Sequence, residues 1–136
     1  MSEGPASAVV YELERARQAL GAAELLHKGG YYADAVSRAY YAVFHAASAL
    51  LASIGRLVRT HDGLRSAIGE HFVRPGRLPP RFGRLLARTA ADRNDADYNT
   101  SSTFTAEDAQ STISDAREFV AMVEAIVASP PPGPSS

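Results

Sequence analysis

The apolar residues of this chain recur three or four positions apart, and no segment alternates regularly between apolar and polar residues. That spacing is typical of helices with one buried face, and it argues against a sheet. We therefore predict an all-α fold, an antiparallel bundle of four long helices plus one short helix. The predicted helices cover residues 7–28, 32–54, 61–72, 81–98 and 106–127.

Capping and turn residues separate these helices. Gly29-Gly30 ends the first helix, because glycine is favoured just past a helix C-terminus. Thr60 is predicted to cap the third helix, and residues 74–80, rich in proline, form a loop. Thr105, with Asp108 three positions later, resembles a capping box at the start of the fifth helix.

Length and composition indicate a single domain. The 136 residues are enough to bury a core, and we assign residues 1–128 to one helical domain and the Pro/Ser-rich residues 129–136 to a disordered tail. The chain has no cysteine, which excludes disulfides, cysteine metal ligands and thiol catalysis. It has neither a signal peptide nor an apolar run of about 18 residues, which predicts a soluble, cytoplasmic protein without a membrane partner.

The net charge of −1 hides an uneven distribution. Residues 56–93 contain nine arginines and three acidic residues, a net charge of +6, so the rest of the chain carries −7. This asymmetry is more informative about partners than the near-neutral total.

The second predicted helix is apolar around most of its circumference, as a central, buried helix would be. A line of alanines on it would let a neighbouring helix approach closely: Ala35, Ala39, Ala42, Ala46 and Ala49. Beside that line runs a polar stripe of four residues at helical spacing: Asp34, Arg38, Tyr41 and His45. A charge inside a core must be paired or used. The stripe is therefore either a buried ion pair with satisfied aromatic groups or a cleft that binds phosphate or moves protons.

The fourth predicted helix carries a second polar feature near its C-terminal end. Its apolar line continues into Arg93 and Asp97, so both side chains are predicted to point inward. An Asp four residues after an Arg is the weaker order for an intrahelical pair, which suggests a core salt bridge or a site. Asn94 and Tyr98 lie around the helix from them and are predicted to reach an edge or a partner chain.

On the opposite face of this helix, three arginines line up without an acidic neighbour within a turn: Arg81, Arg84 and Arg88. With Arg74 and Arg77 in the preceding loop they form a basic ridge. The ridge is either a solvated helix face or a surface that contacts the phosphates of RNA or a nucleotide.

The chain lacks several signatures of other chemistries. Its four histidines lie on different segments without the spacing of metal ligands, so we expect no metal site and no cofactor. His61 and His71, near the ends of the short helix, are assigned capping or surface roles. The sequence contains neither a Gly-rich phosphate loop nor a GxSxG elbow, which disfavours P-loop enzymes and hydrolases of that type.

Four separated blocks of the chain resemble the HEPN domain, specifically the small stand-alone bacterial and archaeal proteins often encoded beside a minimal nucleotidyltransferase. The blocks are residues 32–47, Thr60-His61, Phe72-Val73 and residues 93–98, within a resemblance that covers about residues 13–127. The resemblance implies a HEPN-like helical bundle that forms a homodimer, with a cleft at the dimer interface. It also implies nucleotide or RNA binding, a nucleotidyltransferase partner, and a role in a toxin–antitoxin or defence module.

The chain departs from the motif of HEPN ribonucleases. That motif has an Arg followed directly by a polar residue, and a His separated from the Arg by four to six intervening residues, near the end of a core helix. Arg93-Asn94 matches the start, but Tyr98 stands at the position of the His. Arg38 and His45 have a matching separation, although Ala39 replaces the polar residue and the helix is a different one. We expect Arg38, Tyr41 and His45 to face the same cleft as Arg93.

Three functions follow from these patterns. In the first, the protein binds nucleotide or RNA as the partner of a nucleotidyltransferase, and the binding residues are those of the stripe, the Arg93 region and the ridge: Arg38, Tyr41, His45, Arg93, Asn94, Asp97, Tyr98, Arg81, Arg84 and Arg88. In the second, it is a metal-independent ribonuclease with Arg93 and His45 as catalytic residues. In the third, it is a helical dimer whose polar stripe is purely structural.

Overall fold

The structure of the chain, a computed structural model, describes residues 4–98 and 103–129. It contains five α-helices and one short π-helical turn: α1 (Pro5–Lys28), α2 (Tyr32–Ala52), α3 (His61–Ile68), the π-turn (Gly69–Val73), α4 (Pro80–Tyr98) and α5 (Ala106–Ala128). The described residues contain no strand. The all-α fold is thus confirmed, and the π-turn completes the short helix predicted to reach residue 72. The predicted tail, apart from Ser129, lies outside the described residues.

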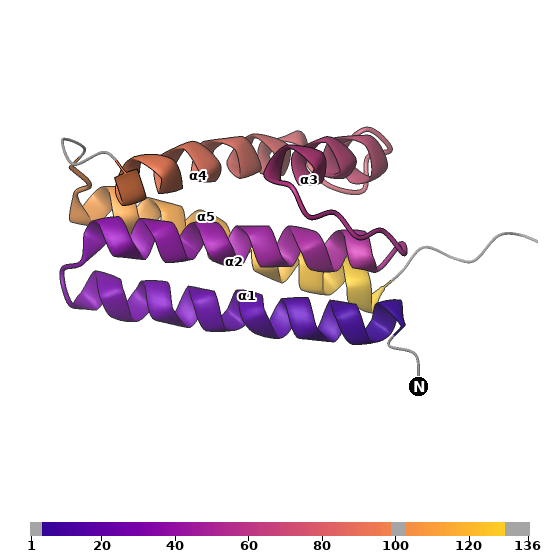
Figure 1. Cartoon of the computed structure of the whole chain (residues 1–136), viewed down its shortest axis with the longest axis horizontal. Helices are drawn as coiled ribbons and strands as arrows, with labels where there is room; N and C mark the ends of the chain where they lie inside the picture. The colour runs from indigo at the N-terminus through magenta and orange to yellow at the C-terminus, as the bar shows by residue number, and fades with distance from the viewer. Residues whose placement is uncertain (1–3, 99–102, 130–136) are drawn as a thin grey trace, which may run out of the picture.

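Helix α2 is the central element of the bundle. Figure 1 shows α1 along one side of it, α5 behind it, and α3 with α4 along the other side. All five alanines of the predicted contact line on α2 have no exposed surface. Small side chains of this kind let a neighbouring helix approach closely, and α1 packs along α2 in Figure 1.

Side-chain caps begin two of the helices as the sequence predicts. The Thr60 hydroxyl accepts a hydrogen bond of 3.1 Å from the backbone N–H of Gly63. A Cβ on Gly63 would lie only 2.7 Å from that hydroxyl, so the first turn of α3 requires glycine there. Thr105 and Asp108 form the predicted capping box, with reciprocal bonds of 2.9 and 3.0 Å. These caps fix where α3 and α5 start and hence how they lie on α2.

None of the described helices combines the length and apolar character that crossing a membrane requires.

Candidate functional site

Arg93 on α4 lies against α2 and is surrounded by aromatic rings. Its Nη2 donates a hydrogen bond of 2.9 Å to the hydroxyl of Tyr41. Its Nε lies 3.0 Å from the Asp97 carboxylate, but the N–H does not point at that oxygen, so the contact is an ion pair without a hydrogen bond. The guanidinium carbon is 5.5 to 5.8 Å from the ring centres of Tyr40, Tyr41 and Tyr98. The Arg93 and Asp97 side chains are little more than a quarter exposed, in line with their predicted inward orientation.

The protonation states in this cluster follow from its contacts. The hydrogen bond to Tyr41 is the main reason why the pKa of Arg93 is raised, so the guanidinium stays charged. Burial raises the pKa of Tyr40, although the nearby Arg93 cation acts in the opposite direction. The Tyr40 hydroxyl therefore remains neutral at pH 7, within 3.3 Å of Nδ1 of His61 on α3. The Arg93 side chain is thus a fixed cation surrounded by tyrosine rings.

Arg38 completes a pair of cations around one tyrosine. Its guanidinium carbon lies 5.7 Å from the centre of the Tyr41 ring, and Arg93 lies 5.5 Å from the same centre. The fold therefore brings Arg38 and Arg93 to one place, although 55 positions separate them in the sequence. Asp34, one turn before Arg38 on the same stripe, is exposed near the N-terminal end of α2. We call Arg38, Tyr41 and Arg93 the tyrosine–arginine cluster.

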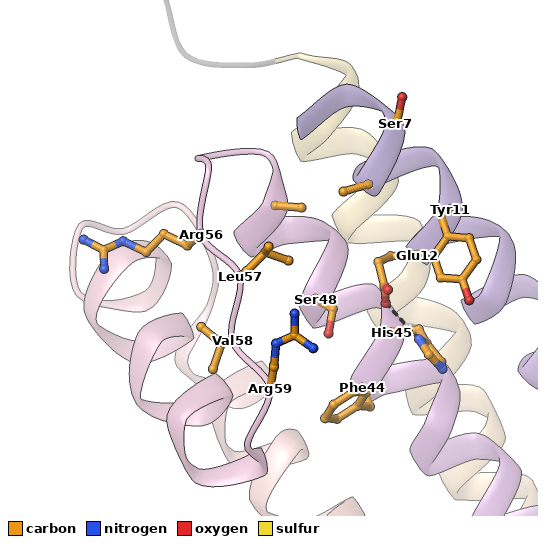
Figure 2. A pocket seen from close by; sticks show the side chains of 12 residues that line it. Ser7, Tyr11, Glu12, Phe44, His45, Ser48, Arg56, Leu57, Val58 and Arg59 are labelled. Atoms are coloured by element: carbon orange, nitrogen blue, oxygen red, sulfur yellow. Dashed lines mark hydrogen bonds and ion pairs between the residues drawn. The ribbon is translucent and has the colours of Figure 1, made fainter. Parts of the chain in front are cut away.

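His45 is held by a carboxylate from α1. Its Nδ1 lies 2.8 Å from Oε2 of Glu12, and both side chains are about one fifth exposed. Figure 2 shows the Glu12 carboxylate and the His45 ring pointing at each other across the α1–α2 contact. A carboxylate on Nδ1 fixes the ring orientation and leaves Nε2 for a ligand. Sequence reasoning missed Glu12, because it reads the first helix by its apolar line, and Glu12 adjoins that line at Leu13.

Two hollows meet at His45 between α1, α2 and the segment that follows α2. The smaller, which we call the small groove, has a volume of about 450 Å³ and is lined by Arg15, Gln18, Ala19, Ala22, Arg38, Tyr41 and His45. The larger, the large groove of about 610 Å³, lies beside it (Figure 2). Its lining includes two aromatic rings, the Glu12–His45 pair, two serines and two arginines: Tyr11, Phe44, Glu12, His45, Ser7, Ser48, Arg56 and Arg59.

The outer face of α4 is arranged differently from the predicted free ridge. Arg81 forms an ion pair with Glu118 of α5, and Arg88 donates a hydrogen bond of 2.6 Å to Asp115 of the same helix. Arg84 is exposed between them. Spacing along α4 could not reveal these acids, because they come from another helix. Two of the three ridge arginines on α4 thus connect this helix to α5.

The remaining predicted residues lie at the end of α4. Asn94 is exposed, and the Tyr98 side chain is 69% exposed although its ring lies near Arg93. Within residues 4–98 and 103–129, the structure places no three histidine or acidic side chains where they could hold a metal ion together. The chemistry that this arrangement offers is recognition of an anion by fixed cations, with one oriented imidazole nearby.

Comparison with known proteins identifies the fold. The model of the HEPN domain matches residues 9–126. The chain is 39% identical to "Putative toxin MJ0605" of Methanocaldococcus jannaschii over 108 residues, which are 79% of this chain and 80% of that protein. It is 32% identical to a UPF0332 protein of Thermotoga maritima over 119 residues, 88% of this chain and 90% of the relative. The match spans the tyrosine–arginine cluster and the small groove, and the chain belongs to the HEPN domain family.

Proposed function

We propose that this HEPN protein binds single-stranded RNA or nucleotide phosphate through the tyrosine–arginine cluster, as a toxin-like module that works with a partner protein. The observation that carries the proposal is the placement of Arg38 and Arg93 against Tyr41. Neither arginine forms a direct hydrogen bond to a carboxylate among the described residues, and Arg93 has only the Asp97 ion pair. Guanidinium groups held on aromatic rings suit phosphates and stacked bases.

The toxin-like role rests on the relatives. Two proteins of Methanocaldococcus jannaschii, 39% and 28% identical to this chain, carry the word toxin in their names. In the same proposal, the protein forms a homodimer, and a minimal nucleotidyltransferase is its partner, as the HEPN resemblance implies. Growth arrest on expression of this chain, relieved by co-expression of that partner, is the expected result in cells.

RNA binding tests the proposal directly. We expect a labelled single-stranded RNA to bind the purified protein in EDTA with an affinity that falls with added salt, because phosphate contacts release counterions. Arg93→Ala should weaken binding about tenfold or more, since it removes a charged contact. The matched control is Arg81→Ala on the same helix, whose arginine already pairs with Glu118. Equal affinities of these two variants would contradict the assignment of the site.

A second candidate function, a metal-independent ribonuclease, is favoured by the Glu12–His45 pair. In that function, the imidazole takes the proton of the RNA 2′-hydroxyl, and the 2′-oxygen attacks the adjacent phosphorus to form a 2′,3′-cyclic phosphate. The P–O5′ bond breaks, the imidazolium returns the proton to the leaving 5′-oxygen, and an arginine neutralises the charge on the phosphate. Cleavage of RNA in EDTA that both His45→Ala and Arg93→Ala abolish would establish it. Binding without cleavage would leave the protein a binding module.

A further inference from the structure

The segment between α2 and α3 is extended, and its backbone is unpaired. Residues 56–59 are neither helical nor part of a turn, and Figure 1 shows the chain crossing there from the end of α2 to α3. Thr60, which follows directly, also has extended backbone angles. Within the described part of the chain, the structure records no backbone–backbone hydrogen bond to or from Leu57, Val58 or Arg59. Unpaired extended backbone is a template on which a second extended segment can pair.

The side chains of this segment alternate, as those of a strand do. Val58 is half-buried and packs against the core. On either side of it, Arg59 is exposed and Leu57 is 79% exposed, the most exposed large apolar side chain among the described residues. Val58 therefore anchors the segment to the bundle, while Leu57 contributes nothing to the chain's own core.

Leu57 belongs to an apolar surface that continues into the large groove. The rings of Tyr11 and Phe44 line this groove of about 610 Å³ together with Leu57, and the Tyr11 side chain is 58% exposed. Between them lie the small side chains of Ala8 and Ala52. A hollow with aromatic walls beside an exposed leucine can bury an apolar side chain from another molecule.

The charges at the groove favour an acidic occupant. The structure records no ion pair for Arg56 or Arg59 in the part of the chain that it describes. Figure 2 shows the Arg59 side chain reaching toward Ser48 inside the groove, whereas Arg56 points away from it. The carboxylate of the lining, that of Glu12, already contacts His45 at 2.8 Å. Arg59 therefore offers its charge to a carboxylate that comes from outside.

We propose that the large groove docks an extended, acidic segment of a partner protein. The segment pairs its backbone with residues 57–59, places an apolar side chain against Tyr11 and Phe44, and sets a carboxylate on Arg59. A peptide fits better than a nucleic acid, because only a peptide has backbone groups that pair with a strand. This inference goes beyond the proposed function, since it uses neither RNA nor the tyrosine–arginine cluster.

Fluorescence anisotropy with a labelled hexapeptide of alternating valine and glutamate tests the surface on the full chain. We expect the wild type to bind this peptide and Leu57→Ser to bind it about tenfold more weakly, because an apolar contact is lost. The matched control is Leu25→Ser, which changes another exposed leucine, on α1 and outside the groove. Both leucines are exposed, so neither change should unfold the protein. No binding by the wild type, or equal affinities of the two variants, would overturn the proposal.

Charge reversal tests the acidic character of the occupant. Arg59→Glu should lose the valine–glutamate peptide and instead bind a hexapeptide of alternating valine and lysine, because the sign of the contact is exchanged. Arg65→Glu, at an exposed position of α3, is the matched control and should keep the preference of the wild type. The same preference in Arg59→Glu as in the wild type would contradict the role of Arg59.

Backbone pairing has a test of its own. The valine–glutamate peptide with methylated backbone nitrogens should not bind, because it cannot donate hydrogen bonds to the carbonyl groups of residues 57–59. Equal affinities of the wild type for the methylated and the unmethylated peptide would overturn strand pairing.

Other occupants of the groove would give different results. Conversion of a wild-type dimer to a monomer by Leu57→Ser, measured by analytical ultracentrifugation, would assign the surface to a second copy of this chain and overturn the proposal. Single-stranded RNA that loses affinity in Leu57→Ser, with no binding of the peptide, would overturn it in favour of RNA.

Failure of this inference can be told apart from failure of the proposed function. Arg93→Ala should bind the peptide as the wild type does. RNA binding that needs Arg93, with no binding of the peptide, would overturn the docking surface and leave the proposed function standing. Peptide binding that needs Leu57, with no binding of RNA, would support the docking surface and contradict the RNA part of the proposed function.

Discussion

Two parts of helix α4 use arginine in opposite ways. On its outer face, Arg81 and Arg88 each pair with an acid of α5, and about half of each side chain is exposed. Near its C-terminal end, Arg93 is 28% exposed, lies among three tyrosine rings and donates its hydrogen bond to the Tyr41 hydroxyl. The outer charges are neutralised within the fold. The inner charge has an ion pair with Asp97 on its own helix but donates its hydrogen bond to a tyrosine hydroxyl, and this difference separates structural arginines from candidate functional ones.

The same contrast occurs on α1, where Arg17 pairs with Glu124 and Arg15 has no acid beside it in its groove. An ion pair between exposed side chains adds little stability, because water already solvates both charges. A partly buried guanidinium with a neutral acceptor is different, because it depends on that acceptor for its remaining hydrogen bond. Arg93 should therefore be the more sensitive to loss of its partner.

The largest stability effect is expected from Tyr41→Phe. This change removes the hydroxyl that accepts from Arg93 and leaves a partly buried N–H group without an acceptor. We expect the free energy of unfolding to fall by about 1–2 kcal/mol, measured by urea denaturation. Tyr11→Phe is the control, since the Tyr11 side chain is exposed and should lose nothing. An equal loss of unfolding free energy in both variants would mean that the Tyr41 hydroxyl stabilises the fold no more than an exposed tyrosine hydroxyl does.

A smaller effect is expected from the outer pair of Arg88 and Asp115. A double-mutant cycle with alanine at both positions should give a coupling energy of about 0.2–1 kcal/mol, because both side chains are solvated. The coupling should decline in high salt, since exposed charges are screened. Coupling as large as the effect of Tyr41→Phe, or independent of salt, would show that the outer face is as tightly organised as the inner one.

The smallest effect concerns Asp92, which also faces Arg88. Burial raises the pKa of Asp92; Asp95 and Asp108 raise it further, and Arg88 opposes them. A raised pKa means that the folded protein holds this proton more tightly than the unfolded chain. The contribution of Asp92 to stability is therefore fully present below about pH 4 and is lost as the pH rises through its folded value.

Asp92→Asn should accordingly increase the midpoint temperature of unfolding slightly at pH 7, and the gain should vanish below about pH 4, where the carboxyl is neutral in both states. Thermal denaturation at the two pH values measures this. Adding Arg88→Ala should enlarge the benefit of Asp92→Asn, because it removes the opposing cation. A gain that is the same at both pH values would mean that charge is not its cause.

Within one helix, spacing is enough to predict much of this protein. The 3.6-residue period placed the helices, the stripe from Asp34 to His45 and the inward orientation of Arg93 and Asp97, because neighbours three and four positions apart share a face. The sequence also predicts the capping box at Thr105, since it consists of two residues three positions apart. HEPN membership followed from several such blocks in order.

Contacts between helices could not be read in this way. Glu118 and Asp115 pair with the ridge arginines, and Glu12 holds His45, but each of these acids is distant in sequence from its partner. A pattern within one segment carries no information about the rotation of the next helix. The sequence by itself determined the helices, their buried faces and the family. Only the tertiary structure decided which charges neutralise one another and which remain for a ligand, because pairing depends on the packing of α1, α4 and α5 around α2.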